Sequence, residues 1–242
     1  WTSTGGAEPY GISATSFRIY VSSSVNASQA ASSTYNWHIN WVAAPPTLSR
    51  SFCAGTTAAS GWALYGDWEG VYSYGSRGIY RTVDISGCGF AAAPVVVTNL
   101  AGSIWHYVSN GGAEPYIVTT TRFVSYIATD INASQASSSA TNWHVNWIAA
   151  EPVLSPTFCA GTTPASGWVD HYEGSGIYRD VDISGCGFTA TPVVSSSLGG
   201  NSNHWTSTGG AEPYWITATS FRIYVSSSVN ASQAASPAKN WH

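Results

Sequence analysis

Charged residues are scarce in this chain. Only 8% of its 242 residues are Asp, Glu, Lys or Arg, against roughly 25% in ordinary soluble domains. Lys239 is the single lysine, and the formal net charge is −4. Binding to nucleic acid or to an anionic membrane surface requires clustered basic side chains, which this composition does not supply. We therefore expect no nucleic-acid partner.

Long apolar runs are also missing. No stretch approaches the roughly 18 consecutive apolar residues that a membrane-spanning helix needs, so the sequence predicts no membrane span. Yet 44% of the residues are hydrophobic, with 12 Trp and 14 Tyr. This content is too apolar for a disordered chain. The composition predicts a folded, aromatic-rich protein.

The sequence offers no convincing catalytic or metal-binding set. Catalysis needs a nucleophile with its base, a pair of carboxylates or a metal site. The recurring Glu8, Glu114 and Glu212 stand between Ala and Pro, which is typical of a turn with a solvated carboxylate. We expect a protein that is not an enzyme, with no catalytic residues, no cofactor and no metal ion.

Asp84 and Asp182 each precede an Ile-Ser-Gly-Cys run. An Asp at such a place usually accepts a hydrogen bond from its own loop. A calcium ligand is the alternative, since Asp180 adds a second carboxylate in one of the two copies.

Internal repeats organise the chain, and they are its most informative feature. The string GGAEPY begins at Gly5, Gly111 and Gly209, so the offsets are 111 − 5 = 106 and 209 − 111 = 98. The difference of 106 − 98 = 8 residues falls between Trp62 and Ile79, as an insertion in a loop. The repeats divide the chain into 1–46, the C-terminal part of one unit; 47–150, a complete unit; and 151–242, a unit without its last strand.

The repeats alternate. Residues 1–38 match residues 205–242 at all but five positions, but match residues 107–144 at only 20 of 38. The sequence therefore begins and ends at the same phase of an alternating pattern. We expect either a segment of a longer tandem array or neighbouring chains that complete each other's terminal units. Either arrangement makes copies of the chain its own partners.

Within a unit the hydrophobic period is two. In the segment 36–42, Trp37, Ile39 and Trp41 point to one face, and the polar residues between them point to the other. Similar short runs, separated by Gly, Pro, Asn and Ser, recur along each unit. About six to eight strands in a unit of about 100 residues predict an all-β fold of tandem antiparallel β-sandwich repeats of the immunoglobulin-like type.

The four cysteines form two repeat-equivalent pairs, Cys53 with Cys88 and Cys159 with Cys186. One disulfide per unit is the simplest interpretation, and it indicates an extracellular protein. We expect each bridge to stiffen the connector that leads into its unit. A zinc site is the alternative, although each unit has only two thiols and no His at ligand spacing.

Asn-Ala-Ser recurs at Asn26, Asn132 and Asn230, each time in a stretch rich in Ser and Ala. Three such motifs at one repeat position favour N-glycosylation of a surface loop. The alternative is a turn in which the Asn and Ser side chains bond their own backbone.

One order of features recurs in the units. A Phe is followed by a Pro-Val-Val strand, then by a Phe-Arg-type strand, and a Trp-x-x-x-Trp-x-Ala strand closes the unit, as from Trp37 and from Trp143. This order resembles the H-type lectin domain over about 70 residues per unit. The resemblance implies a six-stranded antiparallel sandwich that binds galactose-type or N-acetylgalactosamine sugars near subunit junctions. On matching positions it implies that Trp37 with His38, and Trp143 with His144, contact the sugar.

Two further pairs are candidates for sugar binding on their own chemistry. His106 precedes Tyr107, and His204 precedes Trp205. An aromatic ring can stack on a sugar ring while an imidazole bonds its hydroxyls. The alternative is a plain pair of side chains on an exposed strand.

The aromatic residues around the insertion suggest assembly. The segment 62–80 contains aromatic side chains that suit a buried interface better than an idle solvent loop, namely Trp62, Tyr65, Trp68, Tyr72 and Tyr74. Head-to-tail packing of units generates a filament when the rotation does not close. The sequence thus predicts an extracellular structural protein that forms a fibre or surface coat, with a multivalent carbohydrate-binding lectin as the alternative.

Overall fold

The computed structural model describes residues 3–10, 12–23, 52–65, 78–103, 109–129, 133–153, 157–171, 176–201, 208–226 and 229–242. Within these ranges the chain forms thirteen strands, two four-residue α-helices and two 3-10 turns. All strand pairs between the named strands are antiparallel. The all-β prediction is therefore confirmed. No helix in the described ranges is long and apolar enough to cross a membrane.

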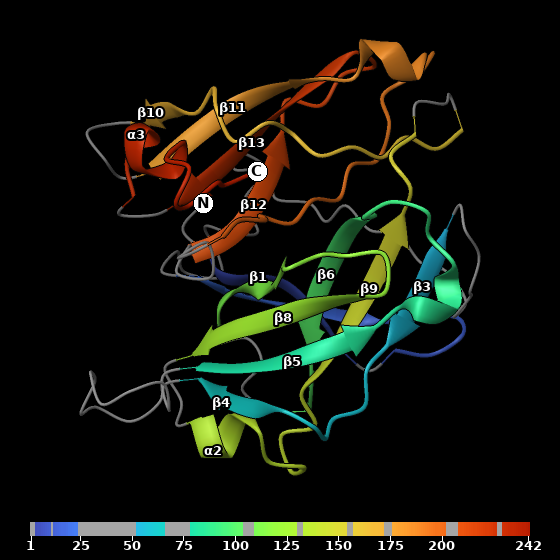
Figure 1. Ribbon diagram of the computed structural model, residues 1–242, viewed down its shortest axis with the longest axis vertical. Coiled ribbons are helices and arrows are strands. Elements are labelled where there is room, and N and C mark those ends of the chain that lie inside the picture. The colour runs from blue at the N-terminus through green and yellow to red at the C-terminus, as the bar shows by residue number, and fades with distance from the viewer. Residues whose placement is uncertain are drawn as a thin grey trace.

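The middle of the chain forms two facing sheets (Figure 1). One sheet has the order β3-β9-β6, with β3 (Cys53–Thr56), β9 (His144–Ala150) and β6 (Val95–Ala101). The other has the order β4-β5-β8-β7, with β4 (Ala63–Tyr65), β5 (Gly78–Asp84), β8 (Arg122–Thr129) and β7 (Ser109–Tyr116). One hydrophobic core joins them, so these seven strands form a β-sandwich.

Strand β9 shows why the sandwich closes. Trp143, Val145, Trp147 and Ala149 are buried, whereas the residues between them are half-buried. The period of two is predicted for the segment 36–42, which lies outside the described residues; its repeat equivalent from Trp143 to Ala149 shows this period. From the opposite sheet, Phe123 packs edge-on against Trp147, with ring centroids 6.0 Å apart.

The C-terminal part of the chain repeats the four-stranded sheet. Its order is β10-β11-β13-β12, with β10 (Val169–His171), β11 (Gly176–Asp182), β13 (Ser220–Ser226) and β12 (Thr208–Tyr214). The β5–β8 and β11–β13 registers coincide after a shift of 98 residues, because Gly78 pairs with Ala128 and Gly176 with Ser226. A second core lies against this sheet and includes Trp168, Ile177, Val225 and Trp241.

The predicted insertion lies in a hairpin connection. Residues 66–77 join β4 to β5, whereas residues 172–175 join β10 to β11. The two connections have 12 and 4 residues, which accounts for the eight extra residues. Both connections lie outside the described residues. The insertion therefore falls between two strands that pair with each other.

The GGAEPY repeats are strands, which corrects their prediction as turns. They form most of β7, of β12 and of β1 (Ser3–Tyr10), which pairs with β2 (Arg18–Ser23). Each strand has a register irregularity at the two glycines, so the glycines make a bulge inside a strand. Glu114 is buried, with 2% of its surface exposed, and is not a solvated turn residue.

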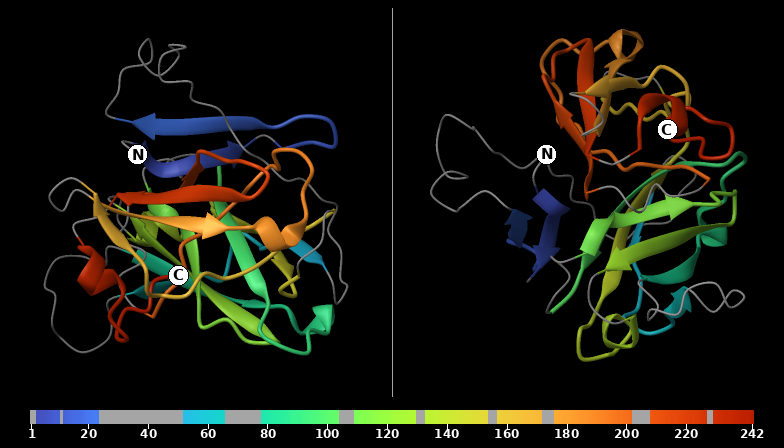
Figure 2. Two further views of the ribbon diagram at one scale, coloured as in Figure 1. Left: turned by 90° about the horizontal axis from the view of Figure 1, so that it is seen from above. Right: turned by 90° about the vertical axis from the view of Figure 1, so that its left-hand side faces the viewer.

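The three GGAEPY strands lie together. Strands β1, β7 and β12 all contact one another, and β6 contacts both β1 and β7. Figure 2 shows the β1–β2 hairpin, in blue, beside the sandwich and beside the second sheet. Equivalent strands of three repeat units therefore pack side by side.

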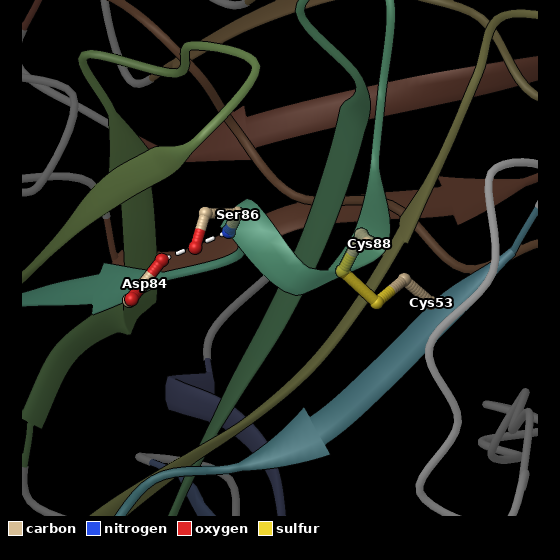
Figure 3. Close-up of a disulfide and its surroundings, with 4 residues drawn as sticks. All are labelled: Cys53, Asp84, Ser86 and Cys88. Carbon is tan, nitrogen blue, oxygen red and sulfur yellow. Dashed lines mark hydrogen bonds between the residues drawn. A yellow bond between two sulfur atoms is a disulfide. The ribbon is translucent and has the colours of Figure 1, made fainter.

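Both predicted disulfides are present. Cys53 of β3 bonds Cys88, which ends the 3-10 turn η1 (Ser86–Cys88) after β5 (Figure 3). The bridge therefore links the two sheets of one sandwich, whereas we had expected it to stiffen the connector before the unit. Cys159, which lies outside the named strands, bonds Cys186 at the end of η3 (Ser184–Cys186).

We predict that Cys53→Ala combined with Cys88→Ala lowers the free energy of unfolding by about 3–4 kcal/mol. The bridge closes a loop of 35 residues in the unfolded chain, and releasing a loop of this size raises the entropy of that state by about this amount. Chemical denaturation followed by tryptophan fluorescence measures the change. An unchanged denaturation midpoint would contradict the prediction.

Candidate interaction sites

The turn after β5 is built by an aspartate. The Asp84 carboxylate accepts a hydrogen bond from the Ser86 backbone N–H at 2.8 Å, and Gly89 ends the turn in the left-handed conformation with φ of 72°. Figure 3 shows Asp84 and Ser86 beside the disulfide. The copy at Asp182 and Ser184 has the same distance. Asp84 therefore accepts a hydrogen bond from its own loop. The turn that it stabilises ends at Cys88, which forms the disulfide with Cys53.

These hydrogen bonds also set the ionisation of the carboxyl groups. The backbone N–H and hydroxyl of Ser86 hold the pKa of Asp84 below its ordinary value, and Ser184 does the same for Asp182. Asp180, which the calcium alternative required as a second ligand, instead pairs with Arg222. In the described ranges, no three His, Cys, Asp or Glu side chains lie together in a way that could hold a metal ion.

In two of the units, an arginine side chain holds a tryptophan against the core, a contact that we call the clasp. The Trp62 indole N–H donates to the Trp143 carbonyl at 2.9 Å, and the Arg81 guanidinium lies 5.3 Å from the centre of the Trp62 ring. Arg81 also donates to the carbonyls of Ala58 and Ser60, and burial lowers its pKa. The clasp ties the loop after β3 to the core.

The second unit repeats this clasp. The Trp168 indole N–H donates to the Trp241 carbonyl at 3.0 Å, and Arg179 lies 5.5 Å from the Trp168 ring centre. Arg179 donates to the carbonyls of Pro164 and Ser166. Because the same contacts occur in both units, we infer that the clasp stabilises the core of each of these units.

The clasp includes one residue of the predicted assembly set. Trp62 is half-buried and packs against the core of its own unit; its role in assembly stays a prediction. Tyr65 ends β4, but its side chain is not described. Trp68, Tyr72 and Tyr74 lie outside the described residues.

The sugar-binding pair implied by the lectin resemblance is placed differently from the expectation. Trp143 is fully buried and presents no ring face to solvent, which corrects its assignment as a stacking residue. His144 is half-buried, and its Nδ1 lies 2.8 Å from the Asn142 carbonyl. Trp37, His38, His106, Tyr107, His204 and Trp205 lie outside the described residues.

Asn230 is the one glycosylation motif within the described ranges, since Asn26 and Asn132 lie outside them. Asn230 is exposed and precedes the helix α3 (Ala231–Ala234) as its N-cap. Its side-chain oxygen accepts hydrogen bonds from the Gln233 N–H at 2.9 Å and the Ser232 hydroxyl at 2.8 Å. The motif therefore forms the turn that was the alternative interpretation, in which its side chains bond the local chain. Asn230 is also exposed, as N-glycosylation requires.

A polar row that the sequence did not reveal crosses the second sheet. Asp180, Arg222 and Tyr214 are register partners on β11, β13 and β12. The Asp180 carboxylate accepts two hydrogen bonds from Arg222, at 2.5 and 2.7 Å. Asp180 keeps the pKa of Arg222 above its ordinary value, and Arg222 lowers that of Asp180. We call these three residues the polar row.

Aromatic rings flank the polar row on both sides. Arg222 lies 4.3 Å from the ring centre of Tyr178 and 4.8 Å from that of Trp215. Trp215 follows β12 with φ of 53° and is 70% exposed. The guanidinium is thus stacked on two rings, and one of these rings extends into solvent.

Comparison of the chain with protein-family models, with curated proteins and with solved structures gives no match. The interaction sites must therefore be judged by their own geometry.

We predict that Asp84→Asn makes stability less dependent on pH in the acid range. The folded-state pKa of Asp84 is lowered, so the carboxylate stabilises the fold above about pH 4, and this contribution is lost as the pH falls through the folded-state value. Asparagine keeps the hydrogen-bond acceptor without titrating. Denaturation between pH 7 and pH 3 should show the stability gap between the native protein and the variant narrowing. A constant gap would contradict the prediction.

We predict that Trp168→Phe lowers the free energy of unfolding by about 1–3 kcal/mol. The variant keeps a ring but removes the N–H that bonds the Trp241 carbonyl, beside a fully buried side chain. Thermal and chemical denaturation measure the loss. Trp215→Phe is the matched control, because Trp215 is 70% exposed and exposed substitutions change stability by less than about 0.5 kcal/mol.

Proposed function

We propose that the protein is a non-enzymatic extracellular structural protein that builds a fibre or surface coat from tandem immunoglobulin-like β-sandwich units. The observation that carries this proposal is the contact among β1, β7 and β12. These strands are copies of one another from three repeat units. Units of this chain therefore pack on each other through an element that every unit carries.

A hydrogen bond between units supports the same proposal. The Thr98 N–H in edge strand β6 donates to the Ser197 hydroxyl of the following unit at 3.0 Å. A free strand edge is an open template for pairing, and here a neighbouring unit occupies part of it. Packing that joins different faces of successive units can continue indefinitely when it does not close into a ring.

The two disulfides support secretion. Disulfides form and persist in oxidising compartments, and both bridges hold equivalent places in their units. N-glycosylation at Asn26, Asn132 and Asn230 belongs to this proposal, because glycans add polar cover to a surface with few charges.

A carbohydrate-binding lectin of the galactose or N-acetylgalactosamine type is the second candidate function. Besides the resemblance to the H-type lectin domain, one observation favours it: an exposed Trp215 beside the hydrogen-bonding groups of the polar row. Several weak sites in a repeated array would give avidity.

We predict that the chain self-associates and that Trp68→Ala, Tyr72→Ala and Tyr74→Ala together weaken the association at least tenfold. Removing large aromatic anchors from an interface commonly costs 2 kcal/mol or more each. Sedimentation velocity over a range of concentrations, with electron microscopy of the same samples, measures the association. The matched control is Ile117→Ala, which removes an exposed side chain outside the insertion.

Filaments or larger species from the native chain, lost in the triple variant and kept in the control, would support the structural function. A native chain that stays monomeric at every concentration, or a triple variant that assembles normally, would contradict it. Circular dichroism of each variant shows that the fold is retained.

A further inference from the structure

The exposed end of β12 presents a fixed aromatic platform. Trp215 has 70% of its surface exposed, and its backbone lies in the left-handed region with φ of 53°, which few residues other than glycine adopt readily. Arg222 stacks at 4.8 Å and Tyr214 lies tilted at 5.1 Å between ring centroids. The indole is thus supported by its neighbours while much of its surface faces solvent.

Groups that can bond hydroxyls lie beside this platform. The Asp180 side chain is 62% exposed and is held in place by two hydrogen bonds from Arg222. Carboxylates have more acceptor positions than these two bonds use, and a guanidinium has five N–H donors. Acceptors and donors therefore lie beside an indole that is 70% exposed.

The charge of the row is balanced. Arg222 is the cation and Asp180 the anion of one bidentate pair, so the row has no net charge to attract a phosphate, a sulfate or an ammonium group. A purely apolar ligand would cover the indole but would not use the acceptor positions of Asp180 that Arg222 leaves open. The chemistry that fits is a neutral molecule with one apolar face and a rim of hydroxyls.

We propose that Trp215 and the polar row bind a neutral pyranose sugar. The C–H face of the sugar ring stacks on the indole, and its hydroxyls donate to Asp180 and accept from Arg222. The inference deepens the second candidate function, since it gives a sugar site on residues other than those implied by the lectin resemblance. The sugar-binding proposal does not depend on the proposed self-association of the chain.

The site belongs to one unit and has a built-in comparison. In the middle unit, the register partners at the same places are Thr82, Val124 and Tyr116, followed by Ile117. Ile117 is also exposed, at 57%, with φ of 52°. The backbone platform is thus shared between the two units, while the aromatic ring and the ion pair occur only in the second.

The test uses the native chain with the methyl glycosides of galactose, N-acetylgalactosamine, glucose and mannose. Saturation-transfer NMR and calorimetric titration up to tens of millimolar glycoside measure binding. At least one glycoside should bind, and Trp215→Ala should weaken its affinity at least tenfold. Arg222→Gln should also weaken it, whereas Ile117→Ala should leave it unchanged.

Absence of binding by all four glycosides, or equal binding by the native chain and Trp215→Ala, would overturn the proposal. Sedimentation of Trp215→Ala separates this inference from the structural function. If the variant loses self-association while the native chain binds no glycoside, the platform contacts a second copy of the chain; the sugar site is then overturned and the fibre stands. Circular dichroism of Trp215→Ala and Arg222→Gln confirms that each variant is folded.

Discussion

The fold depends on covering the apolar face of each four-stranded sheet. In the middle unit this cover comes from the β3-β9-β6 sheet, in which β9 places Val145 and Trp147 in the core and Trp143, just before β9, joins them. Burial of such large side chains is the main favourable contribution to folding. The disulfide lies inside this core and ties β3 to the turn after β5, and Arg81 holds Trp62 against the same core. The disulfide and the clasp both hold the two sheets against one another.

Features repeated along the chain could be predicted from the sequence. The alternation of the segment 36–42 predicts a strand, because a shift of one residue would place polar side chains in the core, and its repeat equivalent in the middle unit is β9. The pairing of Cys53 with Cys88 followed from its recurrence as Cys159 with Cys186. The insertion was located by subtraction of two repeat spacings. In each case the same pattern recurs in a second unit, and this recurrence supports its interpretation in the first.

Features that depend on contacts between strands were missed. Gly-Gly and Pro usually mark turns, yet the GGAEPY segments are bulged strands, because neighbouring strands pair with them on either side of the irregularity. The lectin resemblance implies that Trp143 contacts a sugar at the surface, but its side chain is fully buried in the core. The polar row was invisible because Asp180 and Arg222 are 42 residues apart, and only the register of β11 and β13 makes them neighbours.

The differences between the two four-stranded sheets separate what the fold requires from what one unit has added. The β5–β8 and β11–β13 registers, the aspartate turns, the bridges and the clasps are the same in both, so they serve packing. Asp180, Arg222 and Trp215 stand where the middle unit has Thr82, Val124 and Ile117. An ion pair on an exposed sheet face contributes little to stability, and an exposed tryptophan contributes less than a buried one. These differences are therefore not explained by the demands of folding, and this is the reason that we propose a binding site at this cluster.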